Sequence, residues 1–109
     1  MLAVIMGAFA THGLKQRLSA EMLGVFNTGA QYHFYHAIGL ILVGLVAAHI
    51  STPGIKWSGW LMLAGIIFFS GSLYLLAMTG MRWLGMITPL GGVCFIMAWL
   101  MLALTVLRN

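Results

Sequence analysis

The segment Gln31–Ile50, QYHFYHAIGLILVGLVAAHI, most constrains what this chain can fold into. None of its 20 residues is Asp, Glu, Lys or Arg, and a polar and aromatic start leads into an unbroken apolar run. An α-helix of about 20 residues rises about 30 Å, which is the thickness of the hydrocarbon core of a bilayer. We therefore predict that this segment is a membrane-spanning helix.

The composition of the whole chain agrees with a membrane protein. Hydrophobic residues make up 62% of the chain and charged residues only 6%, and the mean hydropathy is +1.06. A soluble domain carries about 25% charged residues. The 109 residues are enough for one all-α transmembrane domain over positions 1–109. The predicted spans cover approximately residues 1–13, 31–50, 57–78 and 83–107.

Several functional classes lack the residues that they need. The five basic residues are scattered, which argues against nucleic-acid binding. The lone acid, Glu21, lies outside the predicted spans, which argues against ion-coupled transport. His33 and His36 have i, i+3 spacing, but no carboxylate or thiolate lies near them in sequence to complete a metal or haem site. Cys94 lies in an apolar segment and is expected to behave as a small hydrophobe. We predict no enzyme, no metal and no cofactor.

The first apolar run, MLAVIMGAFA, is too short to cross a bilayer alone. The A-x-A pattern at Ala8–Ala10 is typical of a signal-peptide cleavage site, but a basic start is missing. Ala3, Gly7 and Thr11 have the small-xxx-small spacing that lets helices pack closely. These features favour a retained first helix that is short.

Two further boundaries carry helix signals. Ser19 can cap a helix that has Glu21 in its first turn, which predicts an interfacial turn leading into the span at residue 31. Thr88 and Pro89 either kink one long helix or begin a shorter one. We prefer the kinked helix, because residues 83–87 would otherwise be irregular backbone at membrane depth.

Short connections between the spans favour antiparallel neighbours and hence an up-down-up-down four-helix bundle with both termini on one side. The basic residues do not decide the orientation. Lys15, Arg17 and Arg82 fall on one side of the membrane and Lys56 and Arg108 on the other.

In this topology several polar side chains are expected at the same depth in one leaflet. The candidate cluster consists of His12, Gln31, Tyr32, His36, Ser72, Tyr74 and Thr88. It has two interpretations: hydrogen bonds between helices, or a pocket for a lipid or quinone head group with His36 and Tyr32 as donors. Small residues are expected to bring the helices together, namely Gly39, Ser58, Gly65, Gly71 and Gly92. His49 is expected to stand apart at the opposite interface.

Four blocks of the sequence resemble a known family. GAFATHGL, FNTGAQYHFYHAIGLIL, FSGSLYLLAMTG and ITPLGGVCFIMAWLMLA look like the signature blocks of the YgdD/YwdK-like family of small bacterial membrane proteins, which has mitochondrial relatives. The resemblance implies a four-helix membrane fold of unknown biochemical function and assigns no catalytic residues. Family members have about a dozen further apolar residues before the first block, so either the start of this sequence is misassigned or its first helix is cut short.

Two hypotheses about function remain open at this stage. The chain is either a structural or interaction protein, as a homo-oligomer or as an accessory subunit of a larger membrane complex, or a binding or transport module for a small amphipathic ligand near His36. Both place it in the lipid bilayer, and the resemblance implies the bacterial inner membrane.

Overall fold

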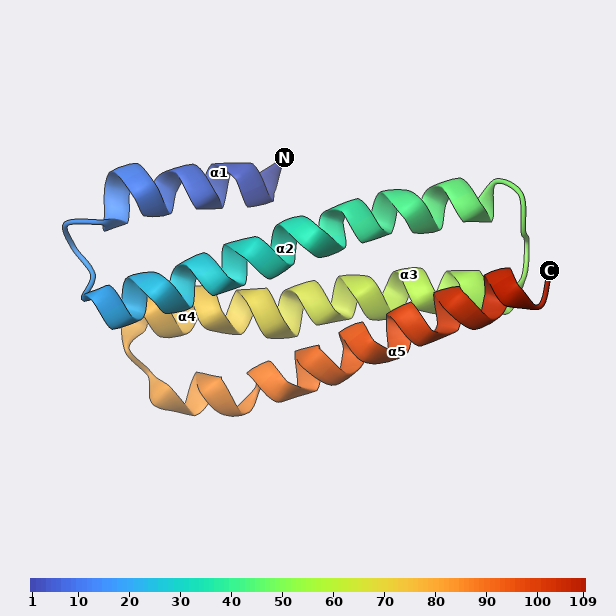
Figure 1. The fold of residues 1–109 in the computed structure, drawn as a ribbon. Coiled ribbons are helices and arrows are strands. Elements are labelled where there is room, and N and C mark those ends of the chain that lie inside the picture. The colour runs from blue at the N-terminus through green and yellow to red at the C-terminus, as the bar shows by residue number, and fades with distance from the viewer.

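The computed structural model describes residues 1–109 and shows an all-α bundle without strands (Figure 1). The helical segments, in chain order, are α1 (Leu2–Phe9), η1 (Ala10–Leu14), α2 (Ala20–Ala47), α3 (Pro53–Gly65), η2 (Ile66–Ser70), α4 (Gly71–Thr79), η3 (Arg82–Met86) and α5 (Thr88–Leu107). The segments η1 and η2 are π-helical and η3 is a 3-10 helix. Together they form four rods, of which α3, η2 and α4 make one.

Three of the rods are long and apolar enough to cross a membrane. They cover Ala20–Ala47, Pro53–Thr79 and Arg82–Leu107, with 28, 27 and 26 residues. The first rod, Leu2–Leu14, is shorter. Successive rods run antiparallel, which confirms the predicted membrane bundle. The C-terminus lies at one end of the bundle, whereas α1 begins partway along α2, so the two termini are not level (Figure 1).

The second span begins earlier than predicted. A separate interfacial turn before residue 31 is wrong, because α2 runs unbroken from Ala20 to Ala47. Ser19 caps this helix as expected: its side-chain oxygen accepts from the backbone N–H of Met22 at 3.2 Å. Polar residues continue the helix because their side chains turn back on it, as Thr28 does by donating to the carbonyl of Gly24 at 3.0 Å.

The preferred interpretation of Pro89 as a kink in one long α-helix is also wrong. The α-helix α5 begins at Thr88, and Pro89 lies in its first turn, where a missing N–H costs no intrahelical bond. Residues 82–86 are not irregular, because they form the 3-10 helix η3 that leads into α5. Hydrogen bonding at this depth is therefore maintained by a tighter helix.

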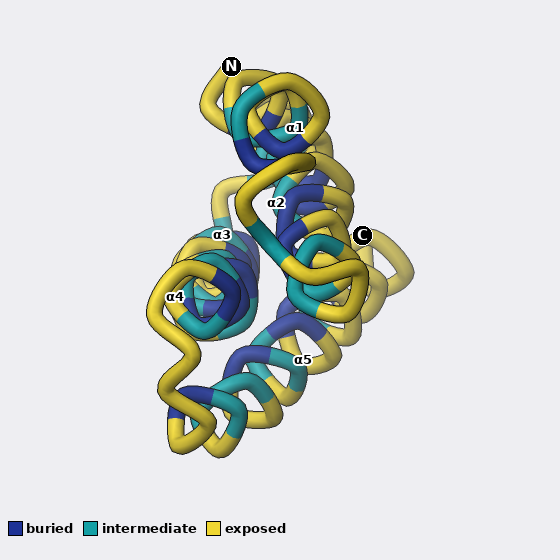
Figure 2. Tube along the Cα trace, turned by 90° about the vertical axis from the view of Figure 1, so that its left-hand side faces the viewer, coloured by how far each residue is buried: buried dark blue, intermediate teal, exposed yellow.

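The arrangement differs from a square bundle in the position of α1. The second, third and fourth rods pack on one another, whereas α1 lies against α2 on the side away from α5 (Figure 2). Two small apolar cores result. One contains Val43, Ile55, Met62, Ala98 and Leu102, and the other contains Ala10, Leu14, Phe26 and Ala77.

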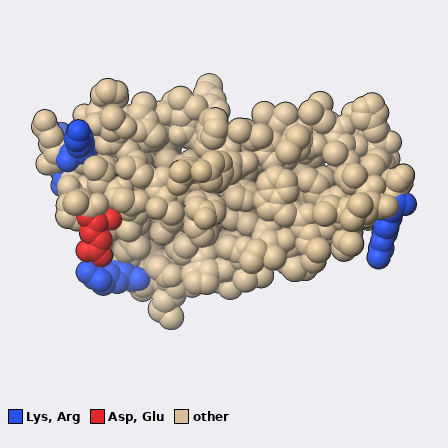
Figure 3. Space-filling view, viewed as in Figure 1, with Lys and Arg blue, Asp and Glu red and all other residues tan.

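The outer surface is that of a protein surrounded by lipid. Only 23 of the 109 residues are buried, and large apolar side chains cover the outside of every rod. The charged side chains gather at the two ends of the bundle, and a long uncharged belt separates them (Figure 3). This distribution places the rods across the bilayer, with the charges at its two surfaces.

Small residues set the helix contacts, but not all the predicted ones do. Ser58 is fully buried, and a Cβ on Gly39 or Gly65 would lie 2.7 Å from Met62 Sδ or 2.4 Å from the Phe95 ring. Gly71 and Gly92 were expected in such contacts and are not: a Cβ there would meet nothing closer than 4.0 and 3.9 Å.

Gly91 takes over the role of its neighbour Gly92, and Gly29 on α2 makes a further close contact with α4. A Cβ on Gly91 would lie 2.3 Å from the backbone nitrogen of Phe69, and a Cβ on Gly29 would lie 3.2 Å from Leu73 Cβ. One residue turns a helix by about 100°, so a small residue one position away from the contact faces elsewhere.

Candidate functional site

The structure confirms one pair of the predicted polar cluster. Ser72 on α4 is buried, and its hydroxyl lies 2.6 Å from that of Thr88 at the start of α5. Ser72 also lies 2.9 Å from the carbonyl oxygen of Phe69, to which its hydroxyl can donate. The left-handed Gly80 (φ 72°) ends α4 and allows the chain to return at once, which brings these two side chains together.

His36 is buried by aromatic rings and not by polar groups. Its ring stacks on Phe95 of α5 with centroids 3.4 Å apart and an interplanar angle of 9°. Its Nδ1–H donates to the carbonyl oxygen of Tyr32 at 2.7 Å, one turn earlier on the same helix. The Tyr32 side chain itself is 39% exposed and packs on Phe69. His36 therefore faces the bundle as predicted, but its bonded nitrogen is satisfied by its own helix.

Tyr74 pairs with a residue that the sequence analysis did not place in the cluster. Its hydroxyl lies 2.9 Å from Nδ1 of His33, and the two rings meet edge to face. The signal was the i, i+4 spacing of Gly29 and His33, which puts His33 on the face of α2 where Gly29 meets Tyr74.

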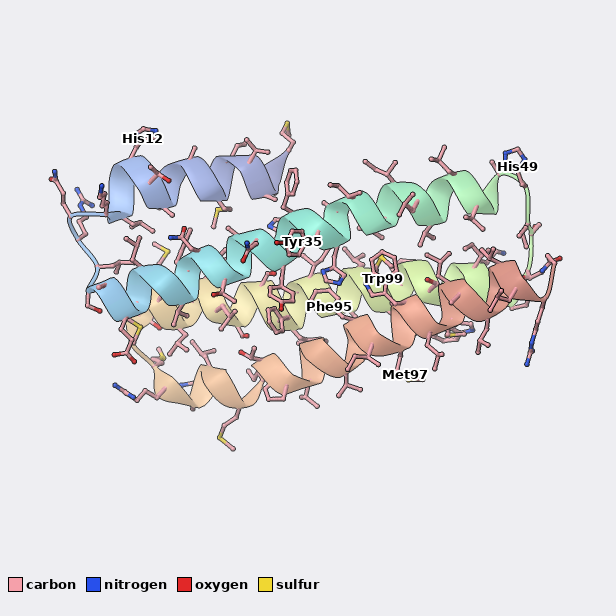
Figure 4. The ribbon with its side chains drawn as sticks, in the orientation of Figure 1. His12, Tyr35, His49, Phe95, Met97 and Trp99 are labelled. Atoms are coloured by element: carbon pink, nitrogen blue, oxygen red, sulfur yellow. The ribbon has the colours of Figure 1, made fainter.

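The single contiguous cluster is wrong, and His12 and Gln31 lie outside the polar pairs. His12 is exposed and points away from the bundle on the outer side of α1, while the exposed His49 lies at the far end of α2 (Figure 4). The cause is the placement of α1, which packs on α2 and not between α2 and α5. Ser70 is fully buried without a hydrogen-bond partner, and none of the cavities reaches it or His36.

Gln31 lines a polar groove between α1 and α2 instead. This groove has a volume of about 490 Å³, and the side chains with polar groups that line it are Thr11, Asn27, Thr28, Gln31 and Tyr35. The two threonine hydroxyls are satisfied, because Thr11 donates to the carbonyl of Gly7 at 3.2 Å and Thr28 to that of Gly24 at 3.0 Å. The amides of Asn27 and Gln31 take part in none of the side-chain hydrogen bonds of the chain.

Comparison with known proteins agrees with this architecture. The family described as "protein of unknown function (DUF423)" matches residues 6–92. The chain belongs to the DUF423 family. The UPF0382 membrane protein YwdK of Bacillus subtilis is 49% identical over 99% of this chain and 89% of its own length.

Two staphylococcal relatives give the same result with similar coverage. A UPF0382 membrane protein of Staphylococcus saprophyticus is 49% identical over 95% of this chain and 86% of its own length. One from Staphylococcus epidermidis is 46% identical over 99% of this chain and 88% of its own length. No solved structure matches the chain. The family resemblance is confirmed, and with it an integral membrane protein whose family has no assigned activity.

The DUF423 family description names no chemistry, so the site has to be judged on its own groups. The chain contains no group of three or more His, Cys, Asp or Glu side chains that could hold a metal ion. The fold provides one hydroxyl–hydroxyl pair between helices, Ser72 with Thr88, and one hydroxyl–imidazole pair, Tyr74 with His33. It also provides the stacked ring of His36 and one groove lined by the unpaired amides of Asn27 and Gln31.

We expect His36→Leu to lower the free energy of unfolding by about 1 to 2 kcal/mol, because the variant loses one hydrogen bond and a stacked ring contact. His49→Leu should leave it unchanged, since His49 is exposed at the end of α2. Thermal unfolding of both variants in mild detergent measures the difference. Equal stabilities would show that the stacking on Phe95 contributes nothing.

Proposed function

We propose that this member of the DUF423 family is a non-enzymatic interaction protein of the bacterial inner membrane that associates with a second copy of itself through the groove between α1 and α2. The observation that supports this function is the unpaired amides of Asn27 and Gln31 on a membrane-spanning helix.

The depth of the two amides makes them costly when they lack partners. Asn27 and Gln31 lie about 10 and 16 Å along α2 from Ala20, at 1.5 Å per residue. A centred helix of 28 residues enters the hydrocarbon core about 6 Å from its end. Both amides therefore lie within the hydrocarbon, where lipid tails offer no hydrogen bonds.

The chemistry of the groove favours a second copy as its occupant. An amide both donates and accepts, so Asn27 and Gln31 of two copies are complementary to each other across a two-fold axis. A phosphate group can only accept and an acyl chain can do neither. Gly7 leaves room for a neighbouring backbone on the α1 side, since a Cβ there would meet nothing within 4 Å.

Localisation and the absence of catalysis have their own support. The relatives are bacterial proteins named as membrane proteins, and helical spans are characteristic of the inner membrane, whereas outer-membrane spans are strands of a barrel. The only carboxylate side chain, Glu21, is exposed at a helix end, and no nucleophile has an acidic partner. A headgroup pocket at His36 is not supported, because Phe95 covers the ring.

The test replaces both amides by residues of similar size without hydrogen-bonding groups. Asn27→Leu together with Gln31→Leu should weaken self-association in mild detergent by at least about tenfold, as expected for the loss of two interhelical hydrogen bonds. Thr28→Val is the matched control, since its hydroxyl lines the same groove but is already bonded to its own helix. Sedimentation equilibrium measures the association constant.

A crosslinking experiment tests the face itself. With Cys94 replaced by serine, Gln31→Cys should give disulfide-linked dimers in native membranes, whereas Ile96→Cys, which is 68% exposed on α5, should not. A wild-type protein that sediments as a monomer, together with a Gln31→Cys variant that gives no disulfide-linked dimer, would contradict the proposal. Equal crosslinking at the two positions would show that the copies do not associate specifically through the groove, which would also contradict the proposal.

A further inference from the structure

A second groove lies at the other end of α2, between its last turns and the first turns of α3. Its volume is about 310 Å³. The residues that line it are Leu40, Val43, Ala47, Ile55, Lys56, Gly59, Trp60 and Leu63. All of them except Lys56 and Gly59 carry apolar or largely apolar side chains, and Lys56 provides the only charge.

The shape of this groove suits an extended chain. It follows α3 from Ile55 to Leu63, a rise of about 12 Å at 1.5 Å per residue. Its floor is closed by Val43 and Ile55, which are 7% and 2% exposed. Gly59 keeps the groove open, because a Cβ there already comes within 3.3 Å of Val43 Cγ1.

The position of Lys56 gives the groove a polar end. Lys56 is exposed in the first turns of α3, next to Trp57 and Trp60, which are 59% and 67% exposed. Exposed tryptophans and lysines are typical of the membrane interface, where a lysine stem follows apolar surface while its ammonium reaches the head groups.

No acidic side chain of this chain neutralises Lys56. The only acid, Glu21, begins α2, and therefore lies at the opposite end of the bundle from the start of α3 (Figure 3). A second copy inserted in the same orientation also has its Glu21 at the other membrane surface. An anionic lipid head group at the interface can supply the counter-charge for Lys56.

We propose that this groove binds an anionic phospholipid, with one acyl chain between α2 and α3 and the phosphate beside the Lys56 ammonium. The apolar floor accounts for the chain and the single cation at the interface accounts for the preference for an anionic head group. This site lies on a different part of the molecule from the α1–α2 groove and does not depend on self-association.

The test compares two lipids that share the same acyl chains, phosphatidylglycerol and phosphatidylcholine, added to the full chain in mild detergent. Native mass spectrometry should show that the wild type retains phosphatidylglycerol in preference. Lys56→Gln should lower this preference about fivefold, the effect of one basic side chain close to an anionic lipid. Arg108→Gln is the matched control: it removes one charge from the same end of the bundle but outside the groove, and should keep the preference.

Gly59→Leu, which fills the groove, should reduce the binding of both lipids. Should this variant fail to fold, quenching replaces it: phosphatidylglycerol with brominated acyl chains should quench the fluorescence of the wild type more than that of Trp60→Phe. An equal loss of preference in Lys56→Gln and Arg108→Gln would overturn the proposal, because it would show general surface attraction. Unchanged binding in Gly59→Leu, or equal quenching of the wild type and Trp60→Phe, would overturn the placement of the acyl chain.

Discussion

Gly91→Ala should lower the free energy of unfolding by about 3 kcal/mol, although it adds a single methyl group. The new Cβ would lie 2.3 Å from the backbone nitrogen and 2.7 Å from the Cα of Phe69. A flexible side chain could turn away, but these atoms belong to the backbone of η2. The rods containing η2 and α5 would have to separate, and the contacts beside Gly91 would be lost. Thermal unfolding in mild detergent measures the loss.

Gly92→Ala is the matched control for this prediction. The nearest atom to its Cβ would be Phe69 Cδ2 at 3.9 Å, which is ordinary van der Waals contact. Alanine also favours a helix over glycine by about 1 kcal/mol, so this variant should be as stable as the wild type or more so. Similar stabilities of the two variants would refute the close approach of α5 to η2.

The second large effect concerns the contact between α3 and α5. Ser58 is fully buried, and its hydroxyl donates to the carbonyl oxygen of Ala98 at 2.8 Å. Ala98 is also fully buried. Ser58→Leu should lower the free energy of unfolding by about 2 to 3 kcal/mol, because the larger side chain meets the backbone of α5 and leaves the two rods no room to stay in contact.

Ser58→Ala separates the effect of size from that of the hydrogen bond. It keeps the small volume and removes only the hydroxyl, so it should cost about 0.6 kcal/mol, the average for such bonds within membranes. A loss in Ser58→Ala as large as that in Ser58→Leu would mean that the hydrogen bond, and not close packing, holds α3 against α5.

Local signals predicted the elements well. The long uncharged runs predicted the membrane-spanning helices. A backbone with unpaired N–H and C=O groups cannot lie in hydrocarbon, so an apolar segment long enough to cross the bilayer forms a helix. Ser19 capped α2 as expected, since capping depends on residues three apart. Ser72 and Thr88 met because the connection from α4 to α5 is short and consists mainly of the 3-10 helix η3.

Predictions that depended on which face of a helix is turned inward, or on which helices it packs against, succeeded less often. Gly91 and not Gly92 meets η2, and a difference of one residue turns the side-chain direction by about 100°. The π-helical turns η1 and η2 also change the number of residues per turn, which rotates the residues after them relative to those of a regular α-helix.

The sequence by itself determined that this protein is a membrane bundle with antiparallel helices, because the bilayer leaves a chain of this hydropathy few other choices. Only the tertiary structure decided that α1 packs outside α2, which places His12 on the surface and leaves Asn27 and Gln31 without partners in a groove. Lipid tails are as apolar as the helix surfaces, so the hydrophobic effect does not favour one neighbouring helix over another. The choice of neighbour is therefore made by close fit between small residues, which depends on distances that a linear sequence does not contain.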